Sequence, residues 1–146
     1  MKKYYQDKIQ RVNCLTNDLN ALYHQAALKF GVSDSALFVL YMIYCKGDNC
    51  LLYDICKEGG ISKQTINSAI RNLETEGILY LEQDKGRTKR ICLTDKGKAY
   101  VQETGARLFE TECNTFSDWT DEEIDMYLKL MEKYNTSFGT QIEKLG

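Results

Sequence analysis

The sequence has a single histidine, His24, and no proline among its 146 residues. It contains no GxSxG nucleophile motif, no phosphate-binding P-loop and no GxGxxG dinucleotide fingerprint, so an enzyme is disfavoured. No apolar run approaches the ~20 residues that a membrane-spanning helix needs. The N-terminal stretch MKKYYQDKIQ has a helical pattern in place of the apolar core of a signal peptide. We therefore expect a cytoplasmic protein with no membrane partner and no cofactor.

Cysteine, in contrast, occurs six times, at positions 14, 45, 50, 56, 92 and 113. These residues lie in apolar-patterned segments of a chain without an export signal, a setting in which thiols stay reduced. Cys45, Cys50 and Cys56 are separated by four and five residues, which matches no CxxC metal pair, and one histidine leaves little for a Cys/His zinc site. We expect buried, unreactive thiols and no metal site.

The net charge of −2 taken alone speaks against a nucleic-acid-binding protein, but the charge is unevenly distributed. Residues 1–93 contain 13 Lys/Arg and 10 Asp/Glu, a net charge of +3, whereas residues 94–146 contain 6 and 11, a net charge of −5. Because binding of a polyanion follows the local field, this asymmetry is a functional hint.

The chain has no low-complexity tract and no internal repeat, and 146 residues are most simply one domain, 1–146. Apolar residues at a helical period predict a helix over residues 1–31 that ends at Gly31. A second helix, DSALFVLYMIYCK, follows Ser33 as its N-cap and ends at Gly47. It is apolar nearly all round, so we expect it at the centre of the fold.

Two short helices joined by a glycine-containing turn come next, an arrangement typical of a helix-turn-helix. The first is expected over residues 52–58, and the glycines of GGIS allow a tight turn. Ser62 caps the second helix, which has one apolar stripe. Its opposite face has no acidic residue, although surface helices usually mix Glu with Lys. The polar residues of this face are Lys63, Gln64, Thr65, Asn67, Ser68, Arg71 and Asn72.

A change of periodicity follows this helix. ILYLEQ and KRICLT are rich in β-branched and apolar residues, and the loop DKGR between them predicts a β-hairpin with a mainly positive charge. Two helices followed by a basic hairpin make a winged helix-turn-helix, which we place at residues 33–93. The predicted fold class is therefore mainly α with a small β-hairpin wing.

Residues 94–146 are expected to be helical again. Thr120 and Glu123 have the spacing of a capping box at the start of the last helix. This helix and the N-terminal one, 1–31, each carry an apolar stripe that exceeds what a small winged helix needs for its core. The surplus predicts a homodimer built from the terminal helices. A compact monomer, with the two terminal helices packed on each other, is the alternative.

The order of these elements and two strings within it resemble the MarR family of bacterial transcription regulators. GGISKQTINSAIRNLETEGIL is similar to the turn and recognition helix of that family, and DKGRTKRICLTDKGKAY to its wing and its Leu-Thr-x-x-Gly entry into a long fifth helix. The resemblance implies six helices, with the wing between the fourth and the fifth. It also implies a homodimer that represses transcription and, in many members, leaves DNA when a small anionic or phenolic ligand binds.

Three features depart from the pattern of the family. Gly59 stands where a bulky apolar residue is usual, and Leu52 and Tyr53 replace polar residues. The wing is shorter than the common DxRDxR form and keeps only Asp84-x-x-Arg87. The first two departures bear on local packing, and the third bears on the contacts of the wing.

Double-stranded DNA as the partner accounts for the acid-free helix face. Carboxylates would be repelled by phosphates, whereas amides and hydroxyls pair with base edges in the major groove and cations reach phosphate or guanine. The residues expected to read bases are Gln64, Thr65, Asn67 and Ser68. The residues expected on the DNA backbone are Ser62, Lys63 and Arg71, the first of them at a helix start that favours phosphate.

The wing is expected to bind the same duplex. Gly86 permits a tight turn at the tip, and Arg87 is expected in the minor groove, where a narrow A·T-rich tract attracts arginine. Lys85, Lys89 and Arg90 are then phosphate contacts. The pairing of Asp and Arg in the family suggests that Asp84 holds Arg87 in place.

A small aromatic or anionic effector is a further expectation. A pocket for it could include Tyr23, His24, Phe38 and Tyr41, although aromatic residues at helical spacing are more often plain core. Organic-peroxide sensors of the family carry a reactive cysteine in the first helix, so a thiol-sensing repressor that uses Cys14 is one alternative function. A winged helix that binds another protein, without DNA specificity, is a second alternative.

Overall fold

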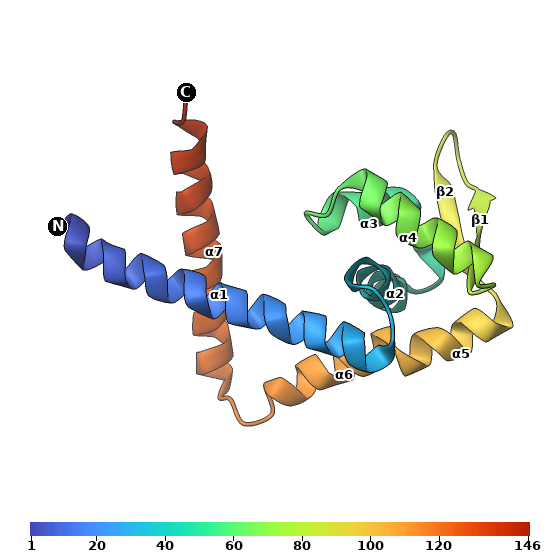
Figure 1. The fold of residues 1–146 in the computed structure, drawn as a ribbon, viewed down its shortest axis with the longest axis horizontal. Helices are drawn as coiled ribbons and strands as arrows, with labels where there is room; N and C mark the ends of the chain where they lie inside the picture. The colour runs from blue at the N-terminus through green and yellow to red at the C-terminus, as the bar shows by residue number, and fades with distance from the viewer. The chain divides into compact units, whose positions relative to one another are not determined.

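The computed structural model describes residues 1–146, except the side chain of Asn49. The chain divides into two compact units, residues 1–109 and residues 110–146. The first unit holds the expected winged helix-turn-helix, in which α3, α4 and the two strands gather around α2 (Figure 1). The predicted fold class, mainly α with a hairpin wing, is confirmed.

Helices α1 (Lys2–Phe30) and α2 (Asp34–Lys46) meet at a left-handed residue, Gly31, whose φ is 71°. The hydroxyl of Ser33 accepts a hydrogen bond from the backbone N–H of Ala36 at 3.1 Å and thereby caps α2. Helix α2 is the central element, as its composition predicts, and Val39 and Leu40 are fully buried. Helix α1 buries only Ala27.

The helix-turn-helix consists of α3 (Leu52–Glu58) and α4 (Lys63–Thr75). Between them Gly60 has a φ of 62°, a conformation that glycine adopts without strain. The other glycine of the turn, Gly59, has an ordinary φ and serves close packing instead, because a Cβ there would overlap the ring of Phe38. The ring of Phe38 thus occupies the space beside Gly59. Helix α4 buries the expected stripe of Ile66, Ala69, Ile70 and Leu73.

Strands β1 (Leu79–Gln83) and β2 (Lys89–Leu93) form an antiparallel hairpin in which Leu81 lies opposite Ile91. At the tip, Gly86 has a φ of 67° and the hydroxyl of Thr88 donates to the carbonyl of Lys85 at 2.6 Å. The base of the hairpin is tied to the chain before α3, since the N–H of Ile91 donates to the carbonyl of Cys50 at 2.9 Å. The hairpin is therefore held from its base, with a free tip.

The expected long fifth helix is broken at Thr104, which gives α5 (Asp95–Glu103) and α6 (Gly105–Thr115). Thr104 leaves the helical conformation, with φ −124° and ψ −83°, and its hydroxyl donates to the carbonyl of Tyr100 at 2.8 Å. Gly105 then passes close to α2, because a Cβ at this position would lie 2.5 Å from the carbonyl oxygen of Leu40. The break lets the backbone of α6 approach the central helix. It also makes the last helix α7, where six helices were expected.

In residues 110–146, α7 (Asp121–Glu143) begins with the predicted capping box. The N–H of Glu123 donates to the hydroxyl of Thr120 at 3.1 Å, and the Glu123 carboxylate accepts from the N–H of Thr120 at 2.9 Å. Just before the helix, the ring of Trp119 lies edge-on to Phe116 and Tyr127. No residue of α7 is buried within the described chain.

The cysteines are free thiols, but the expectation that they are buried is wrong for three of them: Cys14, Cys45 and Cys113 are exposed. Cys14 is exposed because it lies on α1, a helix that buries a single residue. Cys50 is fully buried, and Cys56 and Cys92 are half-buried. Helical periodicity in the sequence showed that these segments have apolar faces, but it did not show which faces pack against another element and become buried.

Among the described residues, no single helix is both long and apolar enough to cross a membrane. The pair α1 and α2, bent by 87° at its junction, meets the test only when the two helices are taken together, by length and composition.

Candidate nucleic-acid interface

A cavity of about 850 Å³, which we call the basic cavity, lies between α3, α4 and the hairpin. Among the described residues that line it, Glu74 is the one acid. Basic side chains reach it from all three elements: Lys57, Lys63, Arg71, Arg87 and Lys89. Cations converging on one concave surface create a positive potential that attracts polyanions such as phosphodiester chains.

Helix α4 borders this cavity with residues of its segment 63–73, which contains no acid, and then with Glu74. Lys63, Asn67 and Arg71 line the cavity, whereas Gln64 and Thr65 lie exposed on the first turn of the same helix. This first turn also carries free N–H groups and the positive end of the helix dipole, which favour an anion.

Three hydroxyls of α4 and its N-cap already make hydrogen bonds within the helix. Ser62 accepts a hydrogen bond from the N–H of Thr65 at 3.2 Å, and the hydroxyl oxygens of these residues lie 2.8 Å apart. Ser68 is half-buried and accepts from the guanidinium of Arg71 at 3.4 Å. Gln64 and Asn67 therefore keep the amide groups that are open to a partner, while Ser62 primarily stabilises the helix start.

The hairpin turns its two faces to different surroundings, because side chains alternate along a strand. Leu81 and Lys89 line the basic cavity together with Arg87 from the loop. Lys85 and Gly86 form the tip, next to Arg87. Among the described residues, no ion pair joins Asp84 to Arg87, so the expected pairing is absent here.

Arg90 lies on the other face of the hairpin. Its guanidinium donates to the carboxylate of Glu82, directly across the two strands, at 2.6 Å. This hydrogen bond holds the pKa of Glu82 below its ordinary value and raises the pKa of Arg90. The structure thus separates Arg90 from Lys85, Arg87 and Lys89, with which the sequence had grouped it.

Sequence reasoning missed two residues of α3. Lys57 and Tyr53 both line the basic cavity, and the side chain of Tyr53 is 62% exposed. They are four residues apart and so share one face of the helix. The sequence did carry a signal, because Tyr53 replaces a polar residue that the resemblance leads one to expect. This departure had been interpreted as a matter of local packing.

The four residues expected to line an effector pocket do not lie around one cavity, and each makes contacts of its own. Phe38 packs on Gly59 and on the main core, and Tyr41 contacts the ring of Phe109 at a centroid distance of 6.4 Å. His24 lies 2.8 Å from the carboxylate of Asp34, an ion pair if the imidazole is protonated, and Tyr23 is exposed on α1. Neither the basic cavity nor the second cavity described below is lined by any of the four.

No group of three or more His, Cys, Asp and Glu residues in the described part of the chain is arranged to hold a metal ion.

Comparisons with known proteins agree with this geometry. A family model described as MarR family matches residues 30–90, which include α2 and the whole helix-turn-helix. The HTH-type transcriptional regulator TcaR of Staphylococcus aureus, in strains Newman and COL, is 26% identical over 148 residues. The match spans 96% of this chain and 97% of TcaR.

Solved structures share the fold. A MarR family regulator from Neisseria meningitidis superposes with a TM-score of 0.82 at 16% identity, and the match covers 94% of this chain and 97% of the other. MepR of Staphylococcus aureus, solved as a complex with DNA, gives a TM-score of 0.69 at 22% identity, over 87% of this chain and 93% of MepR.

Proposed function

We propose that this chain, which matches the MarR family model over residues 30–90 and is similar to the regulator TcaR over most of its length, is a winged helix-turn-helix transcriptional regulator that binds a pseudo-palindromic DNA operator as a homodimer and represses transcription. The observation that carries the proposal is the basic cavity, where cations from α3, α4 and the wing converge beside the open amides of α4.

Helix α4 enters the major groove in this proposal. Gln64 and Asn67 can each form a bidentate hydrogen-bonded pair with adenine, and Thr65 and Ser68 contact neighbouring bases or a thymine methyl. Lys63 and Arg71, with Ser62 at the helix start, hold the phosphates. Carboxylates would oppose this contact, and α4 has none until Glu74, beyond its third turn.

The wing follows the adjacent minor groove. Gly86 turns the tip, Arg87 enters the groove, and Lys85 and Lys89 contact phosphate. Tyr53 and Lys57 of α3 add contacts to the backbone at the side of the basic cavity. Because Arg90 is paired with Glu82 on the other face of the hairpin, we assign it a minor part in binding.

Unburied apolar stripes on two helices support the homodimer. Leu15, Leu19 and Leu22 of α1 are exposed, and so are Leu128 and Phe138 of α7. Large contiguous apolar surfaces mark interaction sites, and a second copy of the same chain is self-complementary by symmetry. A two-fold dimer places its recognition helices in successive major grooves, so half-sites about 10 base pairs apart are expected.

Selection of bound sequences from random duplexes tests the proposal, with Gln64→Ala run in parallel. The expected result is an A·T-rich inverted repeat, with one position in each half-site relaxed in the variant. Gln25→Ala, a matched change on exposed α1, should leave the recovered motif unchanged. Absence of any enriched sequence at low salt would refute the proposal and favour a winged helix that binds another protein.

A thiol-sensing form of the same repressor would use Cys14, whose exposure gives oxidants access. In that case mild organic peroxide should release DNA from the wild type and not from Cys14→Ser. Equal release from both proteins would exclude Cys14 as the sensor.

A further inference from the structure

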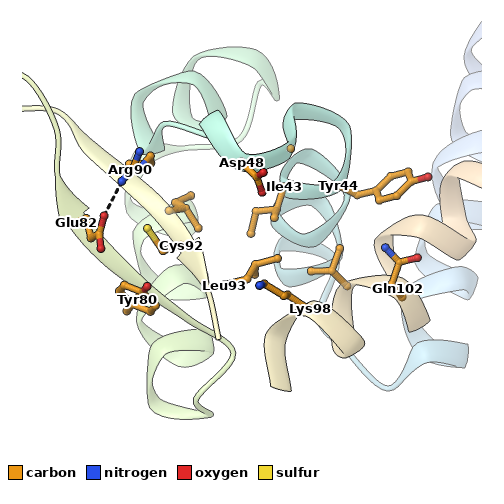
Figure 2. Close-up of a pocket in the computed structure, with 13 residues that line it drawn as sticks. Ile43, Tyr44, Asp48, Tyr80, Glu82, Arg90, Cys92, Leu93, Lys98 and Gln102 are labelled. Carbon is orange, nitrogen blue, oxygen red and sulfur yellow. Dashed lines mark hydrogen bonds and ion pairs between the residues drawn. The ribbon is translucent and has the colours of Figure 1, made fainter. Parts of the chain in front are cut away.

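A second cavity, of about 700 Å³, lies beside the hairpin and shares no lining residue with the basic cavity. Figure 2 shows it between the hairpin, the end of α2 with the 3-10 turn Gly47–Asn49, and α5. The strands contribute different residues to the two cavities: Leu81 and Lys89 line the basic cavity, and their neighbours Glu82 and Arg90 line the second, together with Ile91 and Leu93. One hairpin is therefore a wall of both cavities.

Apolar side chains form the floor of the second cavity. Ile43 comes from α2, Ile91 and Leu93 from β2, and Val101 from α5. Ile43, Ile91 and Val101 belong to the buried core, so the floor is fixed by packing. A volume of this size lies within the range of about 300–1,000 Å³ typical of small-molecule sites, which are also largely apolar with a few polar groups.

Opposite charges stand on two sides of this floor. In Figure 2, Asp48 enters above Ile43, and Lys98 lies on the other side, next to Leu93. Both side chains are exposed, and no hydrogen bond or ion pair joins either of them to another described residue. The remaining charges of the lining, Glu82 and Arg90, neutralise each other in their ion pair.

This arrangement discriminates between ligand classes by charge. A simple anion would be attracted to Lys98 but repelled by Asp48, and a simple cation would meet the reverse. A zwitterion satisfies both groups, and charge-assisted hydrogen bonds from its ammonium and to its carboxylate add to burial of an apolar body. Charge complementarity thus favours a ligand in which a neighbouring ammonium and carboxylate are joined to an apolar group.

We propose that the second cavity binds a free amino acid with a large apolar side chain. Its ammonium donates to the carboxylate of Asp48, its carboxylate accepts from the ammonium of Lys98, and its side chain covers the floor of Ile43, Leu93 and Val101. The binding site stands independently of the proposed function. Its regulatory meaning rests on that function, because the ligand touches the same strands that hold Arg87 and Lys89 against DNA.

The experiment is a calorimetric titration of the full chain without DNA. The probes are L-phenylalanine, L-leucine and two half-analogues of phenylalanine: 3-phenylpropanoate, which lacks the ammonium, and 2-phenylethylamine, which lacks the carboxylate. At least one amino acid should bind, and each half-analogue should bind about ten-fold or more weakly than phenylalanine, because each loses one charge-assisted contact. No heat from either amino acid at millimolar concentration, or equal binding of a half-analogue, would overturn the proposal.

Two variants then assign the contacts. Asp48→Asn should weaken L-phenylalanine and 2-phenylethylamine and leave 3-phenylpropanoate at least as tight, while Lys98→Met should do the opposite. Asp18→Asn and Lys129→Met, matched changes at exposed positions outside the cavity, should change nothing. Identical responses of all three probes to both variants would overturn the assignment. Since no DNA is present, the outcome does not depend on whether the chain recognises an operator.

Discussion

The carbonyl oxygen of Ile78 occupies the space that a side chain on Gly97 would need, so the first turn of α5 lies directly on the chain that enters β1. Thr94 reinforces this contact: its hydroxyl donates to the carbonyl of Ile78 at 3.1 Å and accepts from the N–H of Gly97 at 3.0 Å. The Leu-Thr-x-x-Gly string is thus a structural joint between the hairpin and the helix that follows it.

Gly97→Ala should destabilise the protein by about 2–3 kcal/mol or more, because the added methyl group collides with backbone that has no room to move. Helix propensity alone predicts the opposite sign, a gain of about 1 kcal/mol. Urea unfolding followed by circular dichroism measures the difference. Lys98→Ala, the next residue and exposed, should stay within about 0.5 kcal/mol of the wild type; a neutral Gly97→Ala would contradict the close contact.

Charge removal on the two faces of the hairpin should have unequal effects on DNA binding. Lys89→Ala, in the basic cavity, should lower the affinity and reduce the slope of log K against log salt by about 0.9, the value for one lost phosphate contact. Arg90→Gln, on the face that carries Glu82, should change the slope much less. Fluorescence anisotropy at several salt concentrations gives both slopes, and equal changes would show that Arg90 also reaches phosphate.

Leu128→Asp should dissociate the proposed homodimer, because it places a charge in the apolar stripe of α7. The dissociation constant is expected to rise about a hundred-fold or more, corresponding to about 3 kcal/mol. Sedimentation velocity over a range of protein concentrations measures this change. Thr136→Asp introduces the same charge on the other side of α7 and should leave the dimer intact; a wild type that sediments as a monomer at micromolar concentration would end the dimer proposal.

Cys50 should be the least reactive thiol of the protein. It is fully buried, and burial raises its pKa to about 11 from the ordinary value of 9.0. Because the Cys50 thiol ionises first in the unfolded state, the folded state loses stability as the pH rises from about 9.0 toward 11. Below pH 9.0 the ionisation of Cys50 does not change the stability. Timed alkylation with mass spectrometry at mildly alkaline pH should label Cys14, Cys45 and Cys113 before Cys50, and early labelling of Cys50 would indicate local opening of the core.

Glu82 should titrate below its ordinary pKa of 4.5, mainly because it accepts a hydrogen bond from Arg90. Because the carboxyl pKa is lowered in the folded state, the ion pair stabilises the hairpin above pH 4.5. This stabilisation is lost as the pH falls through the lowered pKa. A carbon-13 titration of the Glu82 carboxyl follows it directly. In Arg90→Gln the pKa of Glu82 should move up toward 4.5, and an unchanged pKa would mean that the pair does not persist in solution.

Most of the fold was predictable from the sequence because capping residues and glycines mark the ends of its elements locally. Ser33, Ser62 and Thr120 cap helices at the expected residues, and Gly31 and Gly86 have the positive φ that their places required. The break at Thr104 was missed, since it arises from the approach of Gly105 to α2, a contact between elements that no local pattern encodes.

The candidate interface was predictable to a similar extent. The acid-free face of α4 marked Lys63, Asn67 and Arg71, which do line the basic cavity. The contribution of Tyr53 and the turning away of Arg90 depend on how α3 and the hairpin are oriented around α4. Strand alternation would have separated Lys89 from Arg90, but basic composition had grouped them into one contact surface.

The hairpin shared by the two cavities also has a thermodynamic consequence. In a closed cycle of protein, operator and amino acid, the factor by which the ligand changes the affinity for DNA equals the factor by which DNA changes the affinity for the ligand. If the ligand weakens DNA binding, a molecule seated on its operator is correspondingly less sensitive to the amino acid than a free one. The ligand concentration that empties a promoter would then be set by the promoter itself, and tighter operators would respond at higher concentrations.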